Sequence, residues 1–163
     1  MTRLETDLLD PLKDDCRIPL EKLSVMLGCS MQEVAEAIDE MEKDGTILRY
    51  RPVINWDKLN INRVEAMIEV RVTPQRDMGF DAVASRIYRF DEVKSVYLMS
   101  GGYDLIVLVE APTLKELAAF VSEKLSVLDT VTGTSTSFVL KRYKQDGVIF
   151  VGEHTDKRLA VSP

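Results

Sequence analysis

The sequence predicts an α+β protein with an N-terminal winged helix-turn-helix and a C-terminal βαββαβ unit. Three observations lead to this prediction. Residues 93–111 form two arms rich in strand-forming side chains around the Gly-Gly pair at 101–102, which is typical of a β-hairpin. Residues 1–46 repeat apolar side chains at helical spacing. A capped helical pattern follows the hairpin and begins at Thr113.

The second arm of the hairpin, residues 105–109, is apolar at every position. A strand in a sheet with one solvent-facing side alternates apolar and polar residues, so this strand needs cover on both faces. The helices of a βαββαβ unit cover only one face. We therefore expect a second copy of the chain to pack against the other face, which gives at least a homodimer. The Gly-Gly pair is expected to accept the φ > 0 angles of a tight turn.

Composition and charge indicate a globular protein. The chain has 163 residues, of which 45% are hydrophobic and 29% are charged, which suits one ordinary domain or two small ones. Cys16 and Cys29 form no CxxC pair, so we expect free thiols. No run of about 18 apolar residues occurs, and the N-terminus has no apolar segment after its charges. We expect a cytoplasmic protein that does not bind membranes.

The first two helices are predicted from leucine spacing and from helix-ending residues. Leucines recur at helical spacing within residues 4–12. Pro11 interrupts this pattern, so we expect a kink or an early end near Asp10. A second helix of two turns is predicted over residues 19–27, because it opens on a proline and Gly28 follows it.

The third helix has the clearest start signal of the N-terminal region. Ser30 is followed three residues later by Glu33, which is the sequence signature of a capping box. The helix is expected to run to about Asp44, and Gly45 ends it in the left-handed conformation. A strand is predicted next, over residues 47–54, and would form the wing.

Alternating strand and helix patterns continue to residue 145. Residues 64–73 alternate as a half-buried strand, and residues 80–90 place apolar side chains on one helical face. A capped helix is predicted over 113–128 and a last strand over 131–143, so the unit is ferredoxin-like with both helices on one face. The predicted segments are a helix-turn-helix domain at 1–46, a wing strand and connector at 47–62, a ferredoxin-like effector-binding and oligomerisation domain at 63–145, and an edge strand (148–151) with a flexible tail at 146–163.

These segments together resemble the leucine-responsive regulator/AsnC (Lrp/AsnC, feast/famine) family of bacterial and archaeal transcription factors. The resemblance rests on the helix-turn-helix, the join DGTILRYRPVINWDKLN, the hairpin VYLMSGGYDLIVLVEA and the strand TSTSFVLKRYK. Its most specific part is residues 100–105, which match the family's SG-x-(Y/F)-D turn. The resemblance implies a RAM/ACT-like C-terminal domain, dimers that assemble into tetramers or octamers, DNA binding by the N-terminal domain, and an amino acid bound at the C-terminal domain.

The resemblance places an effector site at the hairpin turn. The N–H groups of Gly101 and Gly102 are free of side-chain obstruction and suit a carboxylate, and Asp104 supplies a negative charge for an ammonium group. From spacing alone, the simpler interpretation is a turn in which Asp104 is the stabilising acceptor, and both roles are compatible. In family members, the strand positions of Thr134 and Thr136 also line the pocket. The predicted effector-binding residues are Met99, Ser100, Gly101, Gly102, Tyr103, Asp104, Thr134 and Thr136.

The predicted recognition helix, residues 30–43, departs from the family in its charge. It carries five acidic residues and one basic residue, Lys43, although duplex DNA has a negative charge every ~1.7 Å of its axis. Only Gln32 is a conventional base-reading side chain there. Residues 1–60 hold eight Lys or Arg and thirteen Asp or Glu, which accounts for −5 of the net charge of −6. The acidic residues are Glu33, Glu36, Asp39, Glu40 and Glu42. The predicted DNA-binding residues are Arg17, Lys22, Ser30, Gln32, Lys43, Arg49 and Arg51.

Two functions from different classes remain open. The first is an amino-acid-responsive transcription regulator that binds double-stranded DNA weakly through one dimer and more tightly through several. The second is a family paralogue with impaired DNA binding, which acts as an effector-binding subunit in mixed oligomers with a basic partner. Acidic residues 30–43 favour the second function, whereas the retained caps and Gln32 favour the first.

An enzyme is not indicated by the sequence. No Gly-rich phosphate loop with Lys-Ser/Thr, nucleophile elbow or metal-ligand spacing occurs. Siroheme decarboxylase subunits also resemble this architecture, but they need histidines at a tetrapyrrole pocket, and the only histidine here is His154. We expect no catalytic residues, no cofactor and no bound metal.

Overall fold

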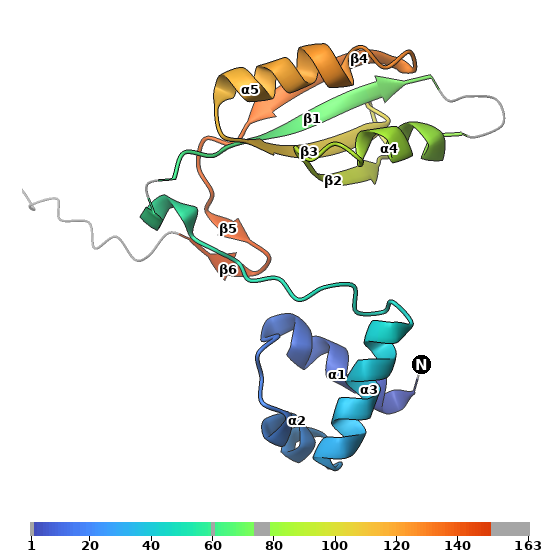
Figure 1. Cartoon of the computed structure of the whole chain (residues 1–163), viewed down its shortest axis with the longest axis vertical. Helices are drawn as coiled ribbons and strands as arrows, with labels where there is room; N and C mark the ends of the chain where they lie inside the picture. Colours follow the sequence, from blue (N-terminus) through green and yellow to red (C-terminus); the bar gives the residue numbers. More distant parts are fainter. Residues whose placement is uncertain (1, 60, 74–78, 151–163) are drawn as a thin grey trace, which may run out of the picture. The chain divides into compact units, whose positions relative to one another are not determined.

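The chain divides into two compact units, residues 1–54 and residues 55–163. The computed structural model describes residues 2–59, 61–73 and 79–150. The first unit is helical and the second is built on an antiparallel sheet (Figure 1). In the described part of the chain, no helix has both the length and the apolar character needed to cross a membrane. The helices of the first unit are α1 (Arg3–Asp14), α2 (Leu20–Leu27) and α3 (Met31–Lys43).

Helix α1 continues through its proline, so the prediction of an end near Asp10 was wrong. The helix runs to Asp14, and the N–H of Asp15 donates to the carbonyl of Pro11 at 2.9 Å. Proline in a helix interior costs about 3 kcal/mol. Leu8 and Leu12 lie on either side of it and are both buried, and each buried leucine contributes roughly 1.5–3 kcal/mol. Burial in the core therefore offsets the lost hydrogen bond.

Helices α2 and α3 begin and end where the sequence predicts. Gly28 ends α2 with φ 67°, a left-handed angle that glycine adopts without strain. Ser30 and Glu33 form both hydrogen bonds of the capping box, and Gly45 follows α3 with φ 80°. Ile38 is half-buried and packs against the core of this unit. The buried core of this unit consists of Leu8, Leu12, Leu23, Val34, Ala37 and Met41.

The predicted wing strand at 47–54 is wrong, because these residues adopt no regular secondary structure. Their backbone is held to α3 instead, through a hydrogen bond of 2.8 Å from the Ile47 N–H to the Met41 carbonyl. A strand needs a neighbour to pair with its backbone groups. In the described part of the first unit there is no such neighbour.

The second unit contains the predicted βαββαβ fold. Four strands form one sheet in the order β2-β3-β1-β4, and every neighbouring pair is antiparallel. The helix α5 continues directly as a π-helix, η2. A short 3₁₀ turn, η1, precedes the sheet. The elements are η1 (Trp56–Leu59), β1 (Val64–Val72), α4 (Asp81–Ile87), β2 (Val93–Leu98), β3 (Leu105–Ala111), α5 (Leu114–Ala119), η2 (Phe120–Leu125) and β4 (Val131–Phe138).

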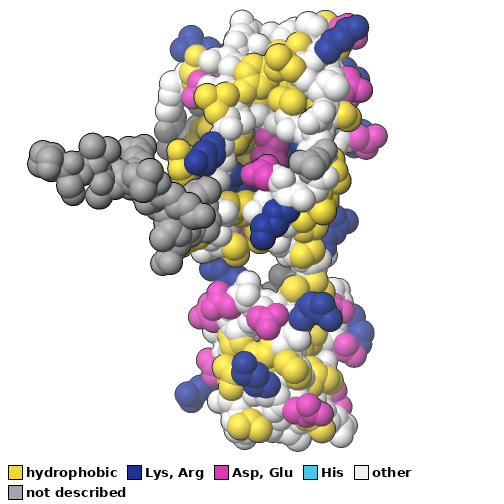
Figure 2. All heavy atoms as spheres, turned by 90° about the vertical axis from the view of Figure 1, so that its left-hand side faces the viewer, with side chains coloured by type: hydrophobic (Ala, Val, Ile, Leu, Met, Phe, Trp, Pro, Cys, Tyr) yellow, Lys and Arg dark blue, Asp and Glu magenta, His cyan; other side chains and the backbone are white. Residues whose placement is uncertain are grey.

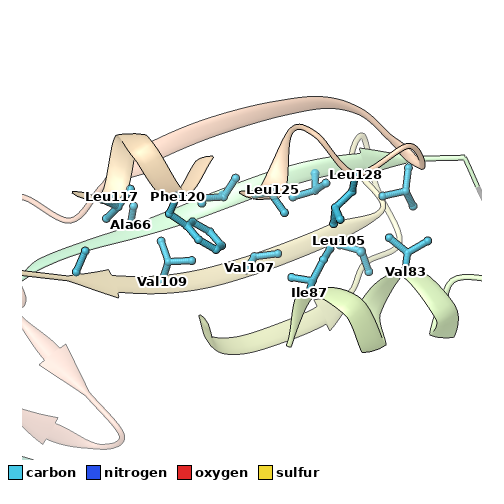
Figure 3. Packing of buried hydrophobic residues seen from close by; sticks show 14 residues of the cluster. Ala66, Val83, Ile87, Leu105, Val107, Val109, Leu117, Phe120, Leu125 and Leu128 are labelled. Atoms are coloured by element: carbon cyan, nitrogen blue, oxygen red, sulfur yellow. The ribbon is translucent and has the colours of Figure 1, made fainter. Parts of the chain in front are cut away.

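One face of the sheet is covered by the helices and forms the core (Figure 3). Strand β3 alternates strictly between buried and half-buried side chains. Val107 and Val109 point from it toward the layer that contains Ile87 and Phe120. The rings of Phe90 and Phe120 meet edge to face, with centroids 5.6 Å apart. Both helices therefore lie on one face, as predicted, and the other face carries no helix among the described elements.

The hairpin between β2 and β3 is present, but its turn is not the predicted tight one. A loop of residues 99–104 joins the strands, and the Met99 N–H donates to the Asp104 carbonyl at 2.8 Å. Neither Gly101 nor Gly102 has φ > 0, and a Cβ at either position would meet no atom within 4 Å. A longer loop spreads the change of direction over several residues, so no residue in it needs a left-handed angle.

The chain after β4 also differs from the prediction. Strand β4 ends at Phe138 rather than near residue 143. The predicted edge strand at 148–151 does not join the sheet: β6 (Val148–Ile149) pairs with β5 (Lys144–Gln145) in a separate two-stranded hairpin. Asp146 and Gly147 close this hairpin with φ of 48° and 82°, and positive φ at both residues is found in one of the two favoured two-residue turns. Residues 151–163 of the predicted tail lie outside the described residues.

Candidate functional site

The loop 99–104 is fixed to the end of β1 by Asp104. The Asp104 N–H donates to the Val70 carbonyl at 3.1 Å, and its Oδ2 accepts the Val72 N–H at 2.9 Å. The carboxylate therefore continues the β1–β3 ladder one step beyond Leu105. This is the stabilising acceptor role that spacing alone suggests. Within the described residues, Oδ1 of Asp104 accepts no hydrogen bond.

A second contact to the same loop comes from Arg71, which is not among the predicted site residues. Its Nε donates to the Gly102 carbonyl at 3.2 Å, and its Cζ lies 5.0 Å from the centroid of the Tyr103 ring. The register of β1 against β4 shifts between Arg71 and Val72. In the sequence, Arg71 was visible only as a polar position of an alternating strand, so no pattern linked it to a loop 31 residues later.

The threonines predicted to line the effector pocket lie on β4. Thr134 is directly opposite Val70, and Thr136 is opposite Ile68. Directly opposite residues share a face of the sheet, so both threonines lie on the side of the buried valine and isoleucine. The structure thus brings Thr134 to the same end of β1 as the loop 99–104, and it places Thr136 one step further along the strand.

The predicted loop residues differ in exposure. Tyr103 and Asp104 are half-buried, whereas the four residues before them are exposed. The N–H groups of Gly101 and Gly102 donate to no described residue. Among the described residues, two donors and one carboxylate oxygen of the loop therefore have no partner.

The sheet face without helices has an apolar centre. We call this surface the open sheet face and define it by Met67, Tyr97, Ile106 and Leu108. Leu108 is opposite Met67 on β1, and Ile106 is opposite Tyr97 on β2. Met67 is 40% and Tyr97 is 52% exposed. Ion pairs lie at one end of this centre, between Glu65 and Arg142 and between Glu110 and Arg63.

The predicted DNA-binding residues are all exposed, but the base-reading candidate is already engaged. The Nε2 of Gln32 donates to Oε1 of Glu36 at 2.8 Å. The carboxylate of Glu33 accepts the N–H and the hydroxyl of Ser30, each at 2.8 Å, and these bonds hold the pKa of Glu33 below its usual value. Ser30 therefore acts as the cap of α3. The exposed residues are Arg17, Lys22, Ser30, Gln32, Lys43, Arg49 and Arg51.

Another acid of α3 binds the segment that follows the helix. The Tyr50 hydroxyl donates to Oε1 of Glu42 at 2.9 Å. Burial and this hydrogen bond raise the pKa of Tyr50 to about 12. The side chains of Asp39 and Glu40 are exposed and make no hydrogen bond or ion pair with the described residues. On the face of the first unit seen in Figure 2, Lys and Arg side chains are scattered among Asp and Glu rather than gathered into one patch.

Comparison with protein families and with individual proteins gives one consistent result. The model of the Lrp/AsnC ligand binding domain matches residues 65–149. The uncharacterized HTH-type transcriptional regulator YugG of Bacillus subtilis (strain 168) is 48% identical over 164 residues, with 100% of this chain and 99% of the relative covered. The proline dehydrogenase transcriptional activator of Rhodobacter capsulatus is 30% identical over 129 residues, which cover 79% and 83% of the two chains. These relatives are named as regulators, which confirms the prediction that the chain is not an enzyme.

Solved structures share the fold. A transcriptional regulator from Neisseria meningitidis, solved as a complex with L-methionine, has a TM-score of 0.70 at 21% identity, with 89% of this chain and 93% of the other covered. AsnC of Escherichia coli has a TM-score of 0.68 at 20% identity, with 89% and 95% covered. At these identities the likeness concerns the fold alone, and it confirms the predicted combination of a helix-turn-helix with an antiparallel α+β domain.

Proposed function

Because the chain belongs to the Lrp/AsnC family of transcriptional regulators, we propose that it is a cytoplasmic regulator whose DNA binding responds to an amino acid. The observation that carries this proposal is the loop 99–104, which lies inside the matched ligand-binding domain and is tied to β1 through Asp104. The L-methionine complex of the neisserial protein supports an amino acid as the class of effector.

The loop has the groups that an amino acid needs. Two unused N–H donors, at Gly101 and Gly102, suit its carboxylate. The unused Oδ1 of Asp104 suits its ammonium group, and such charge-assisted hydrogen bonds are roughly twice as strong as neutral ones. Thr134 supplies a hydroxyl at the same end of β1. The proposed effector site therefore comprises the loop and the neighbouring β4 threonines.

We further propose that the open sheet face binds a second copy of the chain. An apolar centre with charged surroundings is the usual composition of a homodimer interface. Pairing two such faces would cover Ile106 and Leu108 on the side that the helices leave open. Family resemblance supports the assembly of these dimers into tetramers or octamers.

The DNA-binding half is proposed to act through the helix-turn-helix, with several dimers adding their weak contacts. A second candidate function has an observation in its favour. Gln32 is held by Glu36, and Asp39 and Glu40 are unneutralised by the described residues, so α3 presents repulsive charge to phosphates. This observation favours a paralogue that binds the effector and joins mixed oligomers with a basic partner.

As a mechanism, we propose that the effector changes how dimers pack against one another. The connector, residues 47–62, would transmit this change to the helix-turn-helix units. Their new positions would alter the spacing of the paired DNA sites that they can bind. The coupling requires that the amino acid bind one packing arrangement more tightly than the other.

A salt series with a mixed pool of genomic DNA fragments separates the two functions. The regulator is expected to retain selected fragments, with an affinity that falls steeply as salt rises because bound phosphates release counterions. Arg49→Ala should reduce the salt slope by about one if Arg49 contacts a phosphate. No retention at low salt, by a protein that still binds an amino acid, would contradict the regulator and support the effector-binding subunit.

A further inference from the structure

Arg71 is a cation at the proposed effector site with most of its donors unused. Its Nε is bonded to the Gly102 carbonyl, but its Nη groups bond to no described residue. By contrast, Arg63 and Arg142 of the same unit each form an ion pair with a glutamate. A guanidinium carries five N–H donors in a planar fork that matches a carboxylate. Arg71 thus holds a carboxylate-binding fork beside the loop, and no acid among the described residues is paired with it.

The position of this fork is fixed at two points. The hydrogen bond to Gly102 sets the direction of the guanidinium, and the Tyr103 ring lies 5.0 Å from its Cζ. The ring and the cation attract each other and limit the motion of the side chain. Less conformational entropy is then lost when a ligand binds to the fork than when it binds to a mobile arginine.

Arg71 is exposed on the face of β1 opposite to Val70 and Thr134, and the chain leaves space next to it. Its partner on β4 is Gly133, and directly opposite residues share a face of the sheet. A Cβ at Gly133 would meet no atom within 4 Å, and its φ is not positive. Neither crowding nor backbone conformation therefore requires glycine there. The absent side chain keeps the surface beside the guanidinium clear.

The same loop also carries opposite charge, at Asp104. Asp104 is two residues from Gly102, and its Oδ1 is unused by the described residues. Arg71 and Asp104 each hold the loop, yet they form no ion pair with one another. A separated cation and anion at one site match the carboxylate and ammonium groups of a zwitterion.

We propose that Arg71 binds the α-carboxylate of the effector, and that Gly133 leaves the space that this contact needs. The inference rests on the proposed function and adds to it a specificity-determining residue on β1. The Arg71 contact restricts the effector to compounds with a free carboxylate. The carboxamide and the decarboxylated amine of the same amino acid should therefore bind more weakly than the amino acid itself.

The test measures binding of each standard L-amino acid and, for those that bind, of the corresponding carboxamide, by calorimetry on the full chain. The wild-type protein is expected to prefer the amino acid. Arg71→Gln should weaken amino-acid binding about 10- to 100-fold, because a charge-assisted bond is lost, and should leave carboxamide binding nearly unchanged. The amino-acid affinity of Arg71→Lys should lie between that of the wild-type protein and that of Arg71→Gln. Gly133→Val, which suits a strand, should weaken binding while Arg71 is intact.

Arg89→Gln is the matched control. Arg89 is exposed and precedes β2, whereas the loop 99–104 follows β2, so this change should leave both affinities unchanged. Equal losses for amino acid and carboxamide in Arg71→Gln would show that Arg71 only holds the loop and would overturn the inference, as would no loss at all. If the wild-type protein binds no amino acid, the proposed function itself falls, and the inference falls with it.

Discussion

Asp104→Asn is expected to weaken amino-acid binding about 10- to 100-fold while leaving the fold and the dimer intact. The amide oxygen of asparagine can still accept the Val72 N–H that Asp104 accepts at 2.9 Å. The negative charge for the ammonium group is lost, and hydrogen bonds to charged groups are worth about 1.5–3 kcal/mol. Calorimetry gives the affinity, and sedimentation gives the assembly state.

Asp104→Ala separates the two roles of this residue. It removes the charge and also the acceptor, so it should abolish the response to amino acids. It should also lower the free energy of unfolding by about 1–3 kcal/mol, since the Val72 N–H loses its partner. Unchanged amino-acid binding in the asparagine variant would contradict the assigned role. Dissociation of either variant into monomers would also count against it, because Asp104 is placed at the loop and not in the dimer interface.

Leu108→Glu is expected to convert the dimer into folded monomers. Leu108 lies opposite Met67 in the open sheet face, and a carboxylate there would be buried without a partner when a second copy packs on it. Changes at the centre of an interface commonly cost 2 kcal/mol or more, so the dimer should weaken by a factor of about 30 or more. Sedimentation velocity measures the change, and far-UV circular dichroism checks that the monomer remains folded.

Leu114→Glu provides the same chemical change on the helix layer. Leu114 is the first residue of α5 and is 56% exposed, and an acid in the first turn of a helix is favourable. This control should remain dimeric. If Leu108→Glu is also dimeric, then the open sheet face is not where the two copies meet. If both variants dissociate, the helix layer takes part in the interface.

The sequence predicted those parts of the fold that local chemistry controls. The capping box of Ser30 and Glu33 and the αL angles of Gly28 and Gly45 depend on neighbouring residues alone, and all are present. The βαββαβ order followed from apolar spacing, because the side chains that alternate along β3 have one buried face to fill.

Where the predicted elements were wrong, tertiary contacts determined the observed structure. Pro11 lies inside α1 because buried leucines on both sides offset its cost. Residues 47–54 are strand-like in composition but lack a partner strand in the described first unit. The Gly-Gly pair suggested a tight turn, yet the loop is longer. Asp104 is held by β1, and the return strand β3 begins only at Leu105.

In the candidate site, too, features set by local sequence were predicted and features set by tertiary contacts were not. The loop residues were accessible to sequence reasoning because they form one short motif. Arg71 was not, since its link to Gly102 spans 31 residues and arises only from strand register. Likewise, the hydrogen bonds that engage Gln32 and Glu42 could not be read from composition, although the count of acids in α3 had already indicated weak DNA binding.

The central claim is that effector binding and DNA binding are coupled, and reciprocal titration tests it most directly. The affinity for one retained DNA fragment is measured with and without the amino acid that binds best. The affinity for that amino acid is then measured with and without the fragment. A coupled regulator must change both affinities by the same factor, commonly about 5- to 150-fold. If both ligands bind tightly but neither changes the affinity for the other, effector binding and DNA binding are not coupled.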